Sequence, residues 1–418
     1  MRSQTVHLAA GHCPPEDLRA ACAEPGRDPD LVLAFLPPGD ELAPAVAALA
    51  AAWPDSLRVG CEAVTQFADA EMTSRGSIQL FWFDDPDHLP AVEVIEASHQ
   101  EVPAAERIAR LAGSFADADG VLLLSDGLRF PAEFLLDGLR DCLVDGSGDA
   151  GNSARRFPPV AGGLASHREP TSKECRDRRP ARSAATGDQR SRGRQAEPRP
   201  AELAGARVFC GDEIFPSACV AVVFHGVEMR VEVVRGWEPA SPIYRVDRAE
   251  GNVIFEIDGQ PATDWYRRFF IAGDQLVPLP ESSYRFPLLL EGPSPERQGL
   301  YRSMRFFDEP AGAVTFWGGV QPGDLVRLGM GNGDSLVRTA AELPRGAAPE
   351  AAMLYSCVGR EAVLGDRAGQ EVAAIHGALG GISLSGFFTH GEIGPTPRGR
   401  LAFYNLTAVL VLLAEARS

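Results

Sequence analysis

Two short stretches near the C-terminal end of the sequence hold side chains that could do chemistry. Ser356 and Cys357 are potential nucleophiles, and His390 could serve as their base, which would make the protein a hydrolase. No Gly-x-Ser-x-Gly elbow surrounds either nucleophile, so the sequence gives catalysis little support. In a second interpretation, Arg360 holds the carboxylate of an amino acid in a bidentate contact, and Glu392 accepts a hydrogen bond from its ammonium group.

These side chains also have purely structural interpretations. Glu392 could pair with an internal arginine such as Arg360 or Arg367, and His390 could be a packed loop histidine. A haem ligated by His390 stays open, although the sequence contains no Cys-x-x-Cys-His motif. The eight cysteines include no Cys-x-x-Cys pair, so no metal site is predicted and buried free thiols are expected.

Three strand–helix–strand units must position these residues, and each predicts a parallel pair of strands. The units cover residues 30–61, 120–164 and 352–388. Each second strand contains glycine: Gly60, then Gly162 with Gly163, then Gly386. Glycine inside a strand marks the close approach of a ligand or another backbone, or a bulge. The recurrence suggests second strands that border a shared cleft.

The middle of the sequence has a different pattern. Short Val-rich strands are predicted at 219–224 and 228–235, joined as a hairpin. Further strands are predicted at 253–257, 301–307, 313–317 and 324–328. The predicted fold class is α/β to α+β, with two packed halves whose mixed sheets are covered by helices and with more antiparallel sheet in the middle of the chain.

The chain of 418 residues carries a formal net charge of −17. Nucleic acid and anionic membrane surfaces repel a net anion, so neither is expected as a partner. The N-terminus lacks the apolar stretch of a signal peptide, and the late apolar stretch 408–414 is far shorter than the roughly 20 residues of a membrane span. The expected location is the cytoplasm.

One segment differs in composition from the rest. Residues 167–200 hold nine Arg and one Lys against five acidic residues, and they contain no Val, Leu, Ile or aromatic residue. Such a segment has nothing to offset the entropy of ordering, so disorder is expected. Two alternatives stay open, a basic interaction arm and a reading-frame artefact in place of a genuine insert.

Seven short motifs follow one another along the chain. They are Val59–Cys61, Val160–Leu164, Glu250–Val253, Ile257–Ala262, Leu354–Arg360, Gly386–Pro395 and Tyr404–Thr407. Their order and spacing resemble the FIST domains of sensory proteins, and the C-terminal motifs are the most specific. The chain departs from the family at Glu62–Val64, where small residues are usual, and at 167–200, where a compact hairpin is usual.

The resemblance implies a FIST N-terminal-like domain at 1–225 and a FIST C-terminal-like domain at 226–418. It implies a bacterial signal-transduction protein, not an enzyme, that binds a small ligand, with an amino acid or derivative among the suggestions. Some relatives resemble haem-binding nitric-oxide sensors, so haem is the alternative cofactor. A signalling kinase or a cyclic-nucleotide enzyme would be the partner, because no output domain follows in this chain.

The implied ligand site is a cleft between the two halves. Its predicted lining residues are Gly60, Cys61, Gly162, Gly163, Cys357, Arg360, Phe388, His390 and Glu392. Binding there would shift the relative pose of the halves, which a partner could detect.

Overall fold

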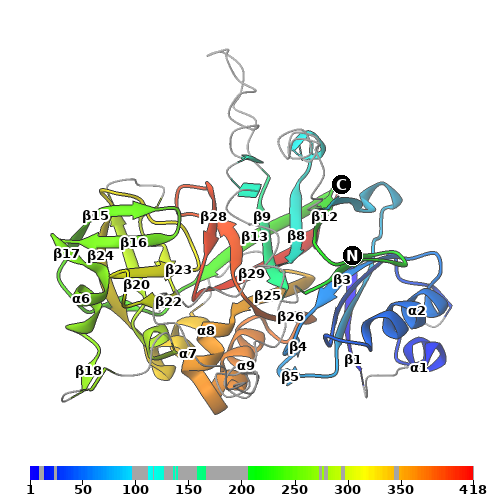
Figure 1. Ribbon diagram of the computed structural model, residues 1–418. Helices are drawn as coiled ribbons and strands as arrows, with labels where there is room; N and C mark the ends of the chain where they lie inside the picture. The colour runs from blue at the N-terminus through cyan, green and yellow to red at the C-terminus, as the bar shows by residue number, and fades with distance from the viewer. Residues whose placement is uncertain are drawn as a thin grey trace, which may run out of the picture.

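Figure 1 shows the computed structural model of the chain, coloured from the N-terminus to the C-terminus. The structure describes residues 1–8, 14–22, 26–96, 112–115, 117–126, 135–136, 138–139, 158–165, 206–272, 275–276, 281–292, 297–342 and 348–417. The helix predicted between the two strands of the unit 120–164, at residues 131–143, lies largely outside these residues, and the basic segment 167–200 lies wholly outside them.

Three six-stranded sheets make up the main body of the described chain. The N-terminal sheet has the order β1 (Arg2–His7), β6 (Ser77–Trp82), β2 (Leu31–Leu36), β3 (Leu57–Glu62), β10 (Val208–Cys210) and β11 (Glu213–Phe215). The bridging sheet has the order β28 (Leu401–Tyr404), β27 (Glu392–Pro395), β9 (Val160–Ala165), β8 (Gly120–Asp126), β12 (Ala218–Phe224) and β7 (Ala91–Glu96). The C-terminal sheet has the order β13 (Val227–Val234), β29 (Ala408–Glu415), β25 (Ala351–Cys357), β26 (Leu384–Thr389), β4 (Gln66–Ala68) and β5 (Glu71–Thr73).

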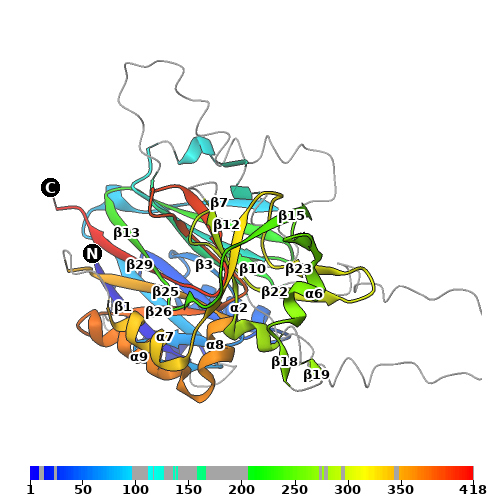
Figure 2. The same ribbon diagram turned by 90° about the vertical axis from the view of Figure 1, so that its left-hand side faces the viewer.

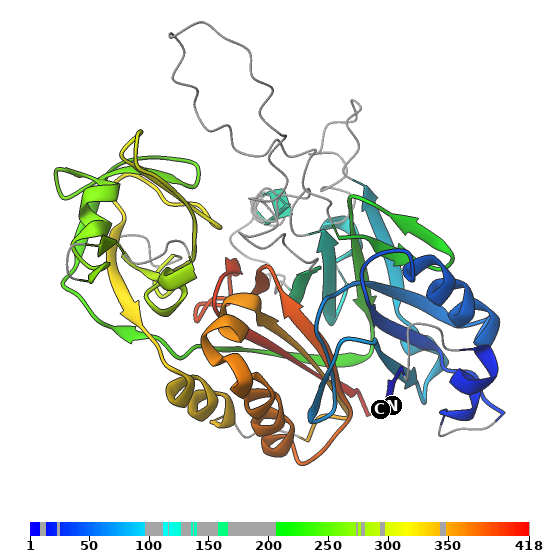
Figure 3. The same ribbon diagram turned by 60° about the horizontal axis from the view of Figure 1, so that its bottom comes forward.

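A separate antiparallel sheet, the middle sheet, lies on the opposite side of this body from the N-terminal helices (Figures 1 and 3). Its order is β21 (Tyr301–Arg302), β20 (Leu288–Gly292), β24 (Leu325–Met330), β15 (Tyr244–Glu250), β16 (Val253–Ile257), β23 (Ala313–Phe316) and β22 (Met304–Asp308). Short strands β14 (Glu238–Pro239) and β17 (Gln260–Pro261) pair at its side, and β18 (Ile271–Ala272) pairs with β19 (Gln275–Leu276). The antiparallel character predicted for the middle of the chain is confirmed.

The helices given in full by the described residues each bury one side against these sheets. They are α1 (Pro15–Ala20), α2 (Leu42–Ala52), α6 (Ala262–Arg267), α7 (Gly333–Ala341), α8 (Val358–Leu364) and α9 (Ala368–Ala378). Helix α2 buries Leu42, Val46 and Leu49 in a cluster with strands of the N-terminal sheet. Helices α7, α8 and α9 lie together below the C-terminal sheet (Figures 1 and 2).

The main core lies where the three six-stranded sheets face one another. Strand β2 shows this clearly, because Leu33 and Phe35 belong to the central cluster while Val32 and Ala34 face α2. Strand β25 alternates in the same way. Strands buried on both faces read as continuous apolar runs, which explains the sequence pattern that predicted them.

The three predicted strand–helix–strand units each contain a parallel pair: β2 with β3, β8 with β9, and β25 with β26. Equivalent glycines occupy the second strands. Their register pairs are Ala34–Gly60, Leu123–Gly162 and Leu354–Gly386. A Cβ added at these glycines would lie 1.8, 2.0 and 1.8 Å, respectively, from the carbonyl oxygen of the register partner. Close backbone approach between paired strands therefore accounts for the recurring glycine.

The hairpin predicted for 219–224 and 228–235 is wrong. Strand β12 pairs with β7 and β8 in the bridging sheet, whereas β13 pairs with β29 in the C-terminal sheet. The chain turns at Gly226, which has a φ of 64°, and passes from one sheet to the next. The local pattern was that of a hairpin, but long-range pairing placed the two strands in different sheets.

Strands are exchanged between the two ends of the chain. The early strands β4 and β5 complete the C-terminal sheet through β26. In return, the late hairpin of β27 and β28 joins the bridging sheet through β9. The fold is α+β with mixed sheets, as predicted. Among the described helices, none is long and apolar enough to cross a membrane.

Candidate functional site

Arg360 is held inside the protein by a carboxylate. It lies on α8, and both Arg360 and Glu371 of α9 are fully buried. The Arg360 Nε donates to Glu371 Oε1 at 3.0 Å, the Nη2 contacts the same oxygen, and Ser356 Oγ donates to Oε2 at 3.1 Å. The guanidinium also lies 5.3 Å from the ring centroid of Trp237. These partners orient Arg360 toward the interior rather than toward a ligand.

Glu392 on β27 is also buried, and its carboxyl group is surrounded by hydroxyl groups. Its Oε1 accepts from Thr389 Oγ1 at 2.5 Å, and its Oε2 accepts from Thr407 Oγ1 at 2.8 Å. The Cys357 thiol hydrogen-bonds to the same carboxyl. Burial raises the pKa of Glu392 from its ordinary 4.5 to about 8, although the hydrogen bonds from the two threonines and Cys357 oppose the change.

The raised pKa makes stability depend on pH. Between 4.5 and about 8, folded Glu392 keeps its proton while the unfolded chain loses it, so this residue makes the free energy of unfolding fall as pH rises. A Glu392→Gln variant cannot ionise, and we expect it to flatten that fall. Urea unfolding across this pH range checks the prediction, with exposed Glu71→Gln as the control. Parallel pH profiles for Glu392→Gln and the parent would contradict it.

Cys357 and His390 both line a small cavity of about 40 Å³. The other described residues that line it are Tyr284, Ser303, Trp317, Val358, Gly359 and Asn405. The imidazole of His390 stacks on Trp317, with ring centroids 6.3 Å apart and planes inclined by 29°. A haem macrocycle is much larger than this space, so in the described arrangement His390 does not offer a place for haem.

The two potential nucleophiles are poorly suited to catalysis. Ser356 is fully buried and donates to Glu371. Cys357 is 4% exposed, and burial raises the pKa of its thiol well above the ordinary value, with the charge of Glu392 acting in the same direction. A thiol in such surroundings stays protonated at neutral pH, whereas a catalytic cysteine needs its thiolate.

The other predicted site residues line neither this cavity nor the larger one described next. Cys61 and Phe388 are buried in apolar clusters. Gly163 packs closely, because an added Cβ would lie 2.6 Å from Thr389 and 2.7 Å from Tyr355. Gly60 and Gly162 are explained by strand pairing. Of the nine predicted residues, the structure brings Cys357 and His390 together at one cavity.

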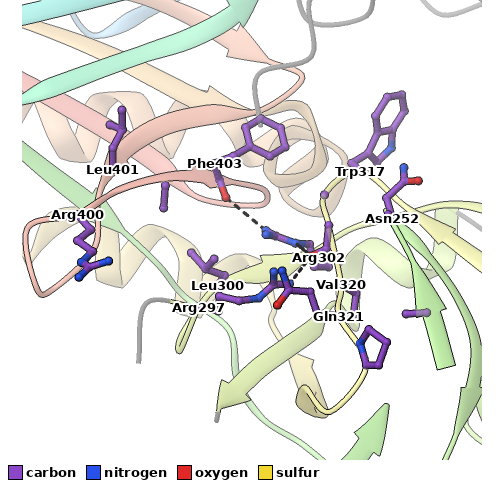
Figure 4. Close-up of a pocket in the computed structure, with 16 residues that line it drawn as sticks. Asn252, Arg297, Leu300, Arg302, Trp317, Val320, Gln321, Arg400, Leu401 and Phe403 are labelled. Carbon is purple, nitrogen blue, oxygen red and sulfur yellow. Dashed lines mark hydrogen bonds between the residues drawn. The ribbon is translucent and has the colours of Figure 1, made fainter. Parts of the chain in front are cut away.

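A much larger cavity, of about 630 Å³, lies between the middle sheet and the β27–β28 hairpin (Figure 4). This volume is in the range of small-molecule sites. The lining comes from four stretches, namely 249–252, 297–302, 317–322 and 400–403. Trp317 lines this cavity and the small one, so it forms part of the wall that they share.

Arg302 connects the two walls of the large cavity. It is 2% exposed, and its Nε donates to the carbonyl oxygen of Gly319 at 3.0 Å while its Nη1 donates to that of Phe403 at 3.3 Å (Figure 4). Gly318 permits this packing, because an added Cβ would lie 2.7 Å from Arg302 Nε. The loop after β23 and strand β28 are therefore linked through one guanidinium group.

The large cavity was not predicted from the sequence, although one of the recognised motifs lies in its wall. The motif Glu250–Val253 forms part of its wall, where the Asn252 side chain donates to the carbonyl oxygen of Phe316 at 2.7 Å and Gly251 accepts from Val320 at 3.0 Å. These bonds shape the loop that carries Trp317. Arg400 is far from Arg297 and Arg302 in the sequence, and the three share no motif, so only the fold brings them to one cavity.

The fold and the cavities describe a mixed α+β protein whose two regions interlock by exchanging strands, with a large cavity beside the antiparallel middle sheet. The FIST N domain matches residues 30–260 and the FIST C domain matches residues 262–395. The chain belongs to the FIST family, whose domains are sensory domains of signal transduction. The domain boundary predicted between 225 and 226 stays a prediction.

Curated relatives match about half of the length of this chain. Uncharacterized protein Rv0628c of Mycobacterium tuberculosis is 28% identical over 221 residues, which cover 50% of this chain and 57% of the relative. Uncharacterized protein Mb0898c of Mycobacterium bovis is 28% identical over 221 residues, which cover 50% of this chain and 56% of the relative. The chain thus matches little more than half the length of these relatives.

Proposed function

We propose that this chain is a cytoplasmic sensory module that binds a small molecule in the 630 Å³ cavity and signals through a separate partner, without catalysis. The observation that carries the proposal is the position of that cavity between the middle sheet and the β27–β28 hairpin. Membership of a sensory family supports the same conclusion. A signalling kinase or a cyclic-nucleotide enzyme remains our proposed partner.

The cavity is well placed to convert binding into movement. Its hairpin wall pairs with β9 of the bridging sheet, whereas its other walls come from the middle sheet. A ligand that contacts both walls stabilises the arrangement in which they are close, and so shifts the population toward that arrangement.

A movement of the β27–β28 hairpin would also affect the three-sheet main body. Glu392 lies on β27 and bonds Thr389 at the end of β26 and Thr407 just before β29. Both of those strands belong to the C-terminal sheet. A shift of the hairpin would therefore disturb buried hydrogen bonds, which do not deform without cost.

An amino acid or derivative is a candidate ligand under this proposal, but its contacts differ from those predicted from the sequence. The carboxylate would meet arginines of the large cavity, because Arg360 is paired with Glu371 inside the protein. Backbone carbonyl groups and the side chains of Asn252 and Gln321 would supply acceptors for an amino group.

The test is a cavity-filling variant. We expect Gln321→Trp, at an exposed lining residue, to abolish the retention of small molecules from a bacterial metabolite mixture in equilibrium dialysis followed by mass spectrometry. Gln298→Trp is the matched control, because Gln298 is also exposed and lies outside the cavity lining. Retention of the same compound by both variants would refute binding in this cavity.

A further inference from the structure

We infer that the cavity takes an organic anion, that is, a small molecule with an apolar body and a carboxylate or phosphate group. The inference rests on the proposed function and names the chemical class of its ligand. It follows from the charge, the hydrogen-bond donors and the apolar surface of the described residues that line the cavity.

The charge of the described lining is entirely positive. Its ionisable side chains are Arg297, Arg302 and Arg400, and no Asp or Glu is among the sixteen described residues that line it. Arg400 lies on the hairpin, across the cavity from the other two (Figure 4). Guanidinium groups on both sides suit an oxyanion, because their planar donors match the oxygens of carboxylate and phosphate.

The arginines on the middle-sheet side are held in fixed positions. Arg302 donates to three carbonyl oxygens, those of Tyr301, Gly319 and Phe403. Arg297 donates to Gly319 at 2.7 Å and to Asp324 at 3.0 Å. Anchored donors bind an anion with little loss of side-chain entropy, which favours affinity.

The size of the cavity, together with the apolar residues in its mostly polar lining, indicates an organic molecule rather than an inorganic ion. Leu300, Trp317, Leu401 and Phe403 contribute apolar and aromatic surface. The volume of about 630 Å³ would leave an inorganic phosphate loosely contacted on most sides. An aromatic or aliphatic body would pack against these side chains while its anionic group meets the arginines.

The positive charge of the cavity lining contrasts with the negative net charge of the whole protein. With a formal net charge of −17, the chain repels anions at long range. A cationic cavity within an acidic protein therefore attracts anions only close to its mouth.

The experiment is a fluorine NMR titration of the full chain with four probes of similar shape and different charge. The probes are 4-fluorobenzoate, 4-fluorophenyl phosphate, 4-fluorobenzylamine and 4-fluorobenzyl alcohol. We expect at least one anionic probe to bind about tenfold more tightly than the amine and the alcohol. The ratio of the two anions shows whether carboxylate or phosphate is preferred.

Arg400→Gln should weaken the preferred anion about fivefold and leave the alcohol unchanged. Arg398→Gln is the matched control, because it removes an exposed arginine from the same hairpin loop outside the cavity lining. Equal binding of amine and anion, or no saturable binding of any probe up to about 10 mM, would overturn the inference. Neutral or cationic probes that bind the parent but not Gln321→Trp would leave the proposed function standing while the anion inference fails.

Discussion

A Glu371→Ala variant is expected to lose about 3–5 kcal/mol of the free energy of unfolding. The substitution leaves the guanidinium of Arg360 buried without its carboxylate, and both side chains of this pair are fully buried. It also removes the acceptor of Ser356 Oγ. Urea unfolding followed by circular dichroism measures the loss, and soluble yield gives a second reading if the variant does not fold.

The control is Glu309→Ala, which breaks an exposed contact with Arg267. Exposed pairs contribute little, so this change should cost less than about 1 kcal/mol. The double variant Arg360→Met with Glu371→Leu should recover much of the loss, because a buried ion pair can be replaced by apolar side chains at small cost. A loss below about 1 kcal/mol for Glu371→Ala would show that Arg360 finds another partner or reaches water.

Replacing Gly386 by alanine should destabilise the protein by about 3 kcal/mol or more. The residue has a φ of 150°, which disfavours any side chain, and the new Cβ would lie 1.8 Å from the carbonyl oxygen of Leu354. Relief would require β25 and β26 to separate at the centre of the C-terminal sheet. Thermal unfolding and soluble yield report the effect.

Gly377→Ala is the matched control for this prediction. Gly377 lies exposed in α9, and an added Cβ there meets no atom within 4 Å. Alanine favours a helix over glycine, so this variant should gain about 0.5–1 kcal/mol. If Gly386→Ala were as stable as Gly377→Ala, the strands would have to tolerate a side chain that the present spacing forbids.

The parallel units could be predicted from the sequence because their signals are local. The run Leu31–Leu36 is apolar throughout, and Pro37, Pro38 and Gly39 end it. In the structure β2 spans Leu31–Leu36 and pairs in parallel with β3, as expected. A strand buried on both faces needs apolar residues at every position, whatever its neighbours are.

Sheet membership could not be predicted in the same way. The adjacent strands β12 and β13 have a pattern typical of a hairpin, yet their partners are β7, β8 and β29. The β12 sequence is compatible with any apolar neighbour, and its partners are chosen by packing across the whole fold. Helix α8 was also missed, since its seven residues contain Gly359 and only two turns.

The partners of charged residues at the candidate site could not be predicted from the sequence either. Arg360 and Glu392 were predicted to contact the carboxylate and the ammonium group of an amino acid, whereas in the structure both are buried with partners inside the protein. The sequence could not show that Glu371 and two threonines would be their partners. The arginines of the large cavity escaped notice, since arginine on a loop is ordinary until the fold places three of them around one space.

The exchange of strands between the two ends of the chain has a consequence for how such proteins can be rearranged. Residues 66–73 complete a sheet built from late residues, and residues 392–404 complete one built from early residues. A gene fragment that encoded one region alone would lack the strands that cover its open sheet edges. We therefore expect each region to fold stably only when the other is encoded with it.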